Sequence, residues 1–498
     1  MKKEKGKKAV CFHGHFYQPP REDPLTGKIP LEPGASPFPN WNERIADQCY
    51  RPNAILGNFE RISFNLGPTL VQWMSERDPQ LLAQIIEQDH SNMRVYGVGN
   101  AMAQAFNHTI LPLSQRRDKV TQIMWGINDF KHRFNHTPSG MWLPETAVDL
   151  ETLDVLAECG IKFTILAPWQ AQIAQLDVSK PYLAELSNGR RISIFFFHQD
   201  LSSRVSFDSN STANADDFLN RFLLPQFDFT SAGSKKDQFL LIASDGEAFG
   251  QHQPFRDKFL AHLLGKAIKN TPLSRSFPAL WLEQHPPVDV VKIRENTSWS
   301  CHHGIKRWAT ECGCTPRGDW KAPLRKALQV IADTIDEIFY DELAPYLSDP
   351  WELRHNYLDV INNILSPQAY ITGRVGKQLN SQEIRKIELL LVAQYECQRM
   401  FTSCGWFFDD FDRIEPRNNV AYAAQAVWLT KLATGIDLSS EAELNLKDVQ
   451  SWRSGLRGNT VFAHQKLRHT SNQYHLVEVE LFYNILWMNW DTIDQSGG

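Results

Sequence analysis

The 498-residue chain exceeds the ~250–300 residues that one hydrophobic core usually serves, so its length predicts two or three domains. Hydrophobic residues make up 42% and charged residues 22%, which is typical of a folded protein and excludes a disordered one. The net charge of −5 argues against nucleic acid as a partner, and no apolar run reaches the about 18 residues of a membrane span.

The cysteine and tryptophan contents bear on location and on ligand class. The eight cysteines show no disulfide framework, and the basic start Met1–Lys8 precedes too short an apolar run for a signal peptide, so we expect a cytoplasmic protein. The 15 tryptophans exceed the need of a core. They are compatible with a carbohydrate site, where sugar faces pack on flat rings, and equally with bulky packing between layers.

In chain order, the first ~320 residues repeat one pattern, a short apolar run that ends abruptly in polar residues. Such runs, rich in β-branched and aromatic residues, are typical of buried strands. The predicted strands are Ala9–Phe12, Val95–Tyr96, Met141–Leu143, Phe163–Leu166, Ile192–Phe197 and Phe239–Ala243.

Helical segments lie between these runs, among them Leu113–Phe134 and Asp149–Cys159, the second followed by Gly160 at a C-cap position. Strands that alternate with helices predict parallel β/α units. Six or seven such units, with polar residues at each strand end, favour a barrel whose active site lies at the C-terminal face of its strands. An open, doubly wound sheet is the alternative.

After about Trp320 the pattern becomes helical. Apolar residues at 324, 328, 331, 335 and 338 form one helix face, and Ile384–Leu391 and Val420–Leu432 predict two further helices. We therefore expect a barrel over residues 1–320 and a mainly helical domain over 321–498. Thr460–Phe462 and Tyr474–Val479 have strand-like character.

Two acidic residues follow predicted strands, Glu145 after Trp142 and Asp245 within Ser244–Gly250. A pair of carboxylates is the minimum for cleavage of a glycosidic bond, because one attacks carbon or activates water while the other protonates the leaving oxygen. A helix N-cap or a structural salt bridge is the alternative for each.

Several motifs resemble glycoside hydrolase family 57, in particular its branch of longer bacterial proteins. His13–Pro20 is similar to the first family motif with two residues inserted, and Gly97–Leu113 to the second. Met141–Glu145 is similar to the third motif, and Ser244–Gly250 to the fourth.

The resemblance implies an incomplete (β/α)7 barrel followed by a helical domain that packs over the barrel mouth. It also implies a retaining mechanism on α-glucans without a metal or cofactor, with Glu145 as nucleophile and Asp245 as general acid/base. For retention we expect the two carboxyl groups about 5–5.5 Å apart. Asp245 must begin protonated, so we expect burial and the charge of Glu145 to raise its pKa.

Further residues are candidates for substrate binding, and each has a structural alternative. The histidines could be structural, or His13 and His15 could bind zinc as in barrel deacetylases. Cys301, Cys312 and Cys314 could form a zinc site with His302 or His303, or be simple buried thiols. Either Asp409 or Asp410 could contact substrate beside Trp406, or the three could belong to a core cluster. The candidate substrate-binding residues are His13, His15, His108, Trp142, His198, Trp299, His303, Trp308, Trp406 and Asp409.

The sequence thus predicts a hydrolase or transglycosylase that acts on α-1,4-glucans through a covalent glycosyl-enzyme. Hydrolysis, chain transfer and branching are equally compatible with these residues, and the oligomeric state is open. The alternatives are a catalytically silent glucan-binding homologue and a metal-dependent carbohydrate deacetylase.

Overall fold

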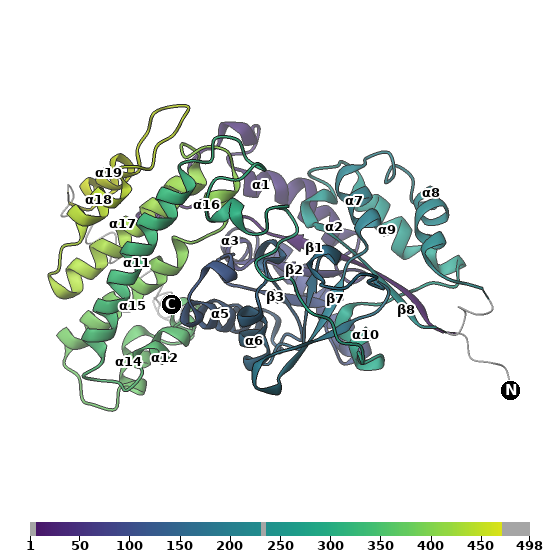
Figure 1. The fold of residues 1–498 in the computed structure, drawn as a ribbon, viewed down its shortest axis with the longest axis horizontal. Coiled ribbons are helices and arrows are strands. Elements are labelled where there is room, and N and C mark those ends of the chain that lie inside the picture. Colours follow the sequence, from purple (N-terminus) through teal and green to yellow (C-terminus); the bar gives the residue numbers. More distant parts are fainter. Residues whose placement is uncertain (1–5, 231–235, 471–498) are drawn as a thin grey trace, which may run out of the picture. The chain divides into compact units, whose positions relative to one another are not determined.

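A computed structural model describes residues 6–230 and 236–470, which form two compact units (Figure 1). The first contains the chain up to Gln18, Leu31–Phe106 and Phe130–Ser300. The second contains Pro19–Pro30, Asn107–Asp129 and the chain from Cys301 onward. This division differs from a single boundary after residue 320, because two early segments join the second unit and the loop 301–320 belongs to it.

The first unit is built on two sheets. In the larger, the strand order is β4-β3-β2-β1-β8, every pairing is parallel, and the short strand β9 pairs with β1. In the smaller, β5 pairs parallel and β6 antiparallel with β7. The strands are β1 (Lys8–Phe16), β2 (Ser63–Leu66), β3 (Ala101–Gln104), β4 (Met141–Trp142), β5 (Phe163–Leu166), β6 (Tyr182–Glu185), β7 (Arg191–Phe196), β8 (Gln238–Asp245) and β9 (Ser274–Arg275).

Two contacts join the two sheets into the predicted incomplete (β/α)7 barrel. A parallel bridge between Gly140 and Phe163 links β4 to β5, and His198 N–H donates to the Leu241 carbonyl over 2.7 Å, from the end of β7 to β8. The first contact requires glycine, because a Cβ on Gly140 would lie 2.3 Å from the Phe163 ring. The parallel strands β1, β2, β3, β4, β5, β7 and β8 therefore surround one core, although the ladder of hydrogen bonds is not continuous.

The interior of the barrel follows the two-residue alternation of its strands. Ala9 and Cys11 of β1 point into the core cluster, as do Phe239, Leu241 and Ala243 of β8. Continuing the same alternation toward the strand ends gives His13 and His15 on β1, and Asp245 on β8. The polar residues at the strand ends thus extend the column of apolar core residues.

The helices of the first unit pack around this barrel (Figure 1). Most predicted elements are confirmed, but Val95–Tyr96 ends a helix that Gly97 closes in a left-handed conformation (φ 76°), and the strand follows at β3. The strand β2 was not predicted. The longer helices are α3 (Pro68–Arg77), α4 (Pro79–Tyr96), α6 (Leu150–Glu158), α7 (Gln199–Phe207), α9 (Arg256–Gly265) and α10 (Pro278–Gln284), and α5 (Arg116–Phe134) contributes to both units.

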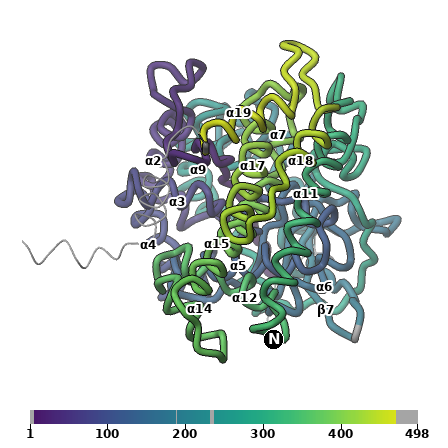
Figure 2. Tube along the Cα trace, turned by 90° about the vertical axis from the view of Figure 1, so that its left-hand side faces the viewer, coloured from purple at the N-terminus to yellow at the C-terminus, as the bar shows by residue number. Residues whose placement is uncertain are grey.

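The second unit is mainly helical, as predicted. Its long helices α11 (Lys321–Leu343), α15 (Ser381–Arg399) and α17 (Ile414–Thr434) lie side by side (Figure 2). Thr460–Phe462 belongs to the helix α19 (Gly458–Thr470), so the expectation of a strand there is wrong; Tyr474–Val479 lies outside the described residues. Shorter helices are α12 (Pro350–His355), α13 (Leu358–Ile361), α14 (Pro367–Arg374), α16 (Cys404–Phe407) and α18 (Ser439–Leu446).

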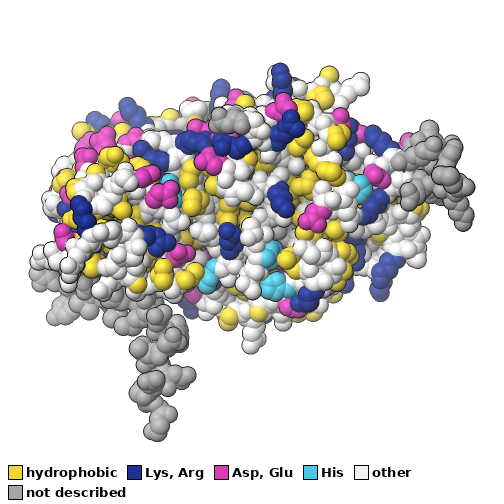
Figure 3. Space-filling view, turned by 90° about the horizontal axis from the view of Figure 1, so that it is seen from below, with side chains coloured by type: hydrophobic (Ala, Val, Ile, Leu, Met, Phe, Trp, Pro, Cys, Tyr) yellow, Lys and Arg dark blue, Asp and Glu magenta, His cyan; other side chains and the backbone are white. Residues whose placement is uncertain are grey.

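The surface carries charges of both signs. On the face that Figure 3 shows, Lys and Arg side chains alternate with Asp and Glu, in keeping with the small net charge. None of the described helices is long and apolar enough to cross a membrane.

Candidate active site

Glu145 occupies a strained backbone position three residues after β4. Its φ of 57° and ψ of 19° lie in the left-handed region, which residues other than glycine rarely adopt and which costs on the order of 1–3 kcal/mol. Trp299 N–H donates to the Glu145 carbonyl over 3.0 Å and helps to hold this conformation. On the half-buried side chain, Oε2 accepts hydrogen bonds from Trp299 Nε1 (3.0 Å) and Ser300 Oγ (2.6 Å). Two donors on one oxygen suit a carboxylate that works as an anion.

Asp245 is the last residue of β8, in register with His15 of the neighbouring β1. Its side chain keeps surface open to water, although protein atoms crowd around it, and this burial raises the pKa of Asp245 to about 6. The direction agrees with the prediction.

An aromatic layer extends from Asp245 toward Glu145. His15, adjacent to Asp245 in the sheet, stacks on Trp142 with ring centroids 5.1 Å apart and meets the edge of Trp299 at 6.3 Å. Trp299 also meets the edge of Trp142 at 5.1 Å and donates to Glu145. The two carboxylates therefore lie at the same end of the barrel, linked by these three rings.

The two histidines of β1 are held by one asparagine. Asn65 Oδ1 lies 3.2 Å from both His13 Nε2 and His15 Nδ1, and His13 Nδ1 lies 3.0 Å from Ser63 Oγ. Burial lowers the pKa of His13 to about 3 and that of His15 to about 4, so both are neutral at neutral pH. Because both ring nitrogens of the fully buried His13 bond within the protein, its position does not suit the predicted substrate contact.

A zinc site on His13 and His15 has no support in the described residues. Within those residues, the one group of three or more His, Cys, Asp or Glu side chains placed to hold a metal ion is elsewhere, at Cys301, His303, Cys312 and Cys314.

The residues that follow Asp245 anchor the loop. Glu247 Oε1 accepts hydrogen bonds from Tyr50 Oη (2.6 Å) and the Tyr17 amide (3.3 Å), and burial raises the pKa of Glu247 to about 8. Gly246 packs so closely on Phe16 that a Cβ would lie 2.2 Å from its ring. The glycine and glutamate of this motif thus fix the backbone on which Asp245 sits.

Two residues of the site escaped the sequence analysis. Ser300 donates to Glu145 and Asn65 orders the two histidines, but neither lies in a recognised motif. The position of Ser300, next to the aromatic Trp299 in a polar-aromatic loop, was the one available signal for it.

Of the other substrate-binding candidates in the first unit, one contacts Glu145 and two have structural roles. Trp299 is half-buried and contacts Glu145 directly. Trp142 is fully buried within the core cluster, so its ring packs inside the barrel. His198 caps α7, since its Nδ1 accepts from the Leu201 amide over 3.3 Å.

The aromatic candidates of the second unit are core residues. Trp308 and Trp406 are fully buried, so in this structure their rings serve as core packing. Trp406 Nε1 donates to the Lys321 carbonyl, and the Arg325 guanidinium covers the Trp406 ring at 4.1 Å. These contacts within the protein account for the polar-aromatic stretch around Trp406, and no ligand is needed to explain it.

The polar candidates of the second unit also have protein partners. His108 is buried, with Nδ1 2.6 Å from Ser403 Oγ, and Asp409 forms an ion pair with Arg453. Asp410 is buried and accepts from Ser451 Oγ over 2.8 Å, so it stabilises a turn.

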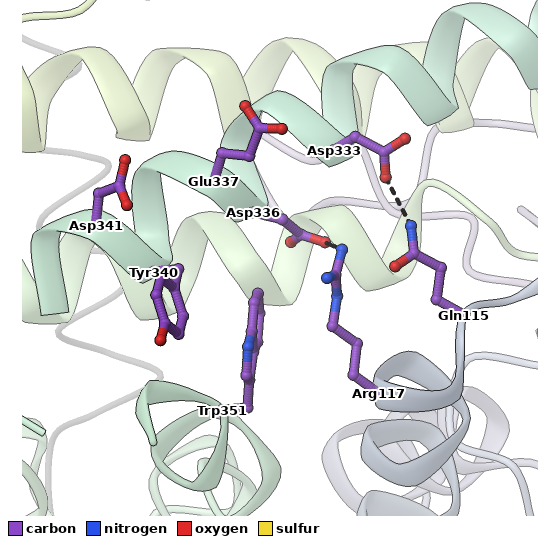
Figure 4. Close-up of a pocket in the computed structure, with 8 residues that line it drawn as sticks. All are labelled: Gln115, Arg117, Asp333, Asp336, Glu337, Tyr340, Asp341 and Trp351. Carbon is purple, nitrogen blue, oxygen red and sulfur yellow. Dashed lines mark hydrogen bonds and ion pairs between the residues drawn. The ribbon is translucent and has the colours of Figure 1, made fainter. Parts of the chain in front are cut away.

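A separate acidic pocket of about 590 Å³ lies within the second unit (Figure 4). Arg117 pairs with Asp336 over 2.5 Å at one side, and the Trp351 and Tyr340 rings stack at the other. None of the predicted site residues lines it. Its lining residues are Gln115, Arg117, Asp333, Asp336, Glu337, Tyr340, Asp341 and Trp351.

Removing the indole N–H that donates to Glu145 should lower activity without abolishing it. Trp299→Phe keeps an aromatic ring but deletes a charge-assisted hydrogen bond of about 1.5–3 kcal/mol, so we expect kcat/KM of a reaction that uses Glu145 to fall roughly 10- to 100-fold. Trp41→Phe is the control, because that ring packs on Arg44 and Gly34. Equal rates for the two variants would show that the Trp299 hydrogen bond does not matter.

Comparison with known proteins identifies a class of barrel hydrolases. The family model described as glycosyl hydrolase family 57 matches residues 37–294, just over half of the chain. The chain belongs to this family, as its motifs predicted. A second model, described as a domain of unknown function (DUF3536), matches residues 317–483.

The curated relatives are longer proteins. α-Amylase 1 of Dictyoglomus thermophilum is 24% identical over 217 residues, which is 42% of this chain and 29% of the relative. A 4-α-glucanotransferase of Thermococcus litoralis is 25% identical over 175 residues, which is 33% of this chain and 25% of the relative. The match thus spans less than a third of the length of either relative.

Solved structures share the fold over almost the whole chain. An exo-type maltose-forming amylase from a Pyrococcus species superposes with a TM-score of 0.72 at 12% identity, covering 96% of this chain and 95% of that one. A family 57 branching enzyme from Pyrococcus horikoshii gives 0.57 at 14% identity, covering 97% of each chain. At such identities the likeness shows the fold alone.

Proposed function

We propose that the protein is a retaining α-glucan hydrolase or transglycosylase in which Glu145 is the nucleophile and Asp245 the general acid/base. The observation that carries the proposal is the contrast between the two carboxyl groups. Glu145 accepts two hydrogen bonds on one oxygen, which stabilises its anion, whereas burial raises the pKa of Asp245 to about 6. Two carboxyl groups in environments of opposite effect are the usual basis for an acid and a nucleophile in one site.

The chemistry follows from these states. Glu145 attacks the anomeric carbon while protonated Asp245 gives its proton to the departing glycosidic oxygen, which leaves a glycosyl-enzyme ester on Glu145. Asp245, now a carboxylate, removes a proton from water or from an acceptor sugar hydroxyl, and that oxygen displaces Glu145 from carbon. Anomeric configuration is retained, because each step inverts it once.

The substrate class rests on the relatives. The amylases and glucanotransferase that share the family act on α-glucans by their names, and the half-buried Trp299 ring beside Glu145 offers apolar surface to a sugar. We place this chain among α-1,4-glucan enzymes on those grounds.

Trapping of the covalent intermediate tests the proposal. The chain is incubated with a mechanism-based glucosyl fluoride and digested, and we expect one labelled peptide, with the sugar on Glu145. In parallel, the products from maltoheptaose distinguish hydrolysis (shorter sugars) from transfer (longer linear sugars) and branching. Glucan binding with no label and no product would instead assign a silent binding protein.

The rate should depend on pH through Asp245. The first step needs its protonated form, so kcat/KM on maltoheptaose should fall above about pH 6, approaching tenfold per pH unit. A maltosyl fluoride needs no protonation of its leaving group, so its kcat/KM should lack this alkaline decline. A decline that persists with the fluoride would assign the titration to another group.

A further inference from the structure

The loop between Ser300 and α11 gathers three of the eight cysteines and one histidine at a single point. Cys301 Sγ lies 3.8 Å from Cys312 Sγ and 3.7 Å from Cys314 Sγ. Cys314 Sγ lies 3.4 Å from His303 Nδ1, and all four atoms lie within 4.8 Å of one another.

These separations fit a tetrahedral metal site. A disulfide would bring two sulfurs to about 2.05 Å, far below the distances between these thiols. Zinc binds thiolate sulfur at about 2.3 Å and imidazole nitrogen at about 2.0–2.1 Å, so a regular tetrahedron sets sulfurs about 3.8 Å apart and sulfur and nitrogen about 3.5 Å apart. The observed distances of 3.7, 3.8 and 3.4 Å agree with that geometry.

Two tight turns present the four side chains in pairs. In the first, Gly304 N–H donates to the Cys301 carbonyl over 3.1 Å, and Gly304 has the left-handed φ of 79° that closes the turn. In the second, Thr315 N–H donates to the Cys312 carbonyl over 3.1 Å. Each turn therefore carries two of the four candidate ligands, separated by one residue. The ligand atoms of both turns lie within 4.8 Å of one another.

The surroundings suit a negatively charged centre. Lys321, at the start of α11, is fully buried, and its Nζ has no hydrogen-bond partner in the described part of the chain. A buried ammonium is costly unless an anion offsets it, and the nearby Cys301 and Cys312 supply that charge when they are thiolates. The backbone amides of His303 and Arg307 also bond to the Cys301 sulfur, as outer contacts of metal thiolates commonly do.

We propose that Cys301, His303, Cys312 and Cys314 bind one structural zinc ion. Three thiolates and a neutral imidazole complete the tetrahedral shell, which leaves no position for substrate and assigns the ion to folding of the loop rather than to catalysis. The proposal is independent of the proposed function, since neither Glu145 nor Asp245 takes part. It revises the expectation from sequence that the chain holds no metal.

Metal analysis of the full-length chain tests the site. Purified under reducing conditions and dialysed, the protein should hold one zinc ion per chain by plasma mass spectrometry. Exchange for Co²⁺ should produce the near-ultraviolet absorption of cobalt thiolates and the visible bands of a tetrahedral ion. Cys312→Ser and Cys314→Ser should lose the metal and both absorptions, whereas Cys404→Ser, the same change outside the cluster, should keep them.

Thiol reactivity of the unaltered chain gives a second test that does not depend on the variants folding. Half-buried Cys314 should resist iodoacetamide until a chelator removes the zinc, and then react. A reduced chain that binds neither zinc nor Co²⁺, a disulfide among the three cysteines, or reaction of Cys314 at one rate with and without chelator would each overturn the proposal.

Discussion

Replacing Glu145 with glutamine should lower kcat/KM on maltoheptaose by on the order of 10⁴- to 10⁶-fold, as removal of a nucleophile does in other covalent enzymes. The amide has nearly the shape of the carboxylate, and its carbonyl oxygen can still accept from Trp299 Nε1 and Ser300 Oγ. The fold should therefore survive while the atom that attacks the anomeric carbon loses its charge.

Product formation from maltoheptaose measures the loss, and circular dichroism confirms that the variant is folded. Glu87→Gln is the matched control, because Glu87 is an exposed carboxylate of the same unit that pairs with Arg94 on the surface of α4. Its rate should equal that of the parent. Undiminished turnover by the Glu145 variant would exclude Glu145 as nucleophile.

Much of the fold was predictable because it rests on local pattern. The strands of a barrel are buried apolar runs, and six short runs indicated the architecture even where one of them, Val95–Tyr96, belongs to a helix end. The strand β2 was not predicted because its four residues include a buried serine and asparagine, Ser63 and Asn65, whose partners are histidines of β1. A strand whose buried polar residues bond to a neighbouring strand lacks the apolar run by which strands are recognised in a sequence.

The candidate site was predictable where a motif reports chemistry and not where contacts are remote. Glu145 and Asp245 stand in recognisable motifs. Ser300 lies 155 residues from Glu145, so no spacing connects them. The backbone of Glu145 is left-handed, and a hydrogen bond from the Trp299 amide to the Glu145 carbonyl helps to hold it. This conformation also leaves no signal in the sequence.

The sequence left open whether the many tryptophans bind a ligand or pack the core, and the structure shows both positions. Trp299 reaches Glu145, while Trp142, Trp308 and Trp406 are fully buried. The neighbours of the rings differ: a carboxylate for Trp299, histidines for Trp142, and an arginine and a backbone carbonyl for Trp406. Sequence proximity to a motif is therefore a poor guide to which tryptophan meets a ligand.

Trp142→Ala should destabilise the barrel by about 3–5 kcal/mol, the usual cost of deleting a large buried aromatic side chain. Trp142 has no exposed surface, and it supports the site from beneath: His13 stacks on it at 4.7 Å, His15 at 5.1 Å, and the edge of Trp299 meets it at 5.1 Å. The cavity would remove one packing contact from each of the three rings, so activity should fall together with stability.

Urea-induced unfolding followed by circular dichroism measures the change, and Phe207→Ala is the control, because an aromatic ring that is 88% exposed should contribute within about 0.5 kcal/mol. Trp142→Phe should recover part of the loss, since the smaller ring still fills most of the space between the histidines and the core. If Trp142→Ala weakened glucan binding yet unfolded at the urea concentration of the parent, Trp142 would contact substrate after all. The buried stack beneath Glu145 and Asp245 argues for the opposite result, because the rings that order the site draw their own rigidity from the barrel core.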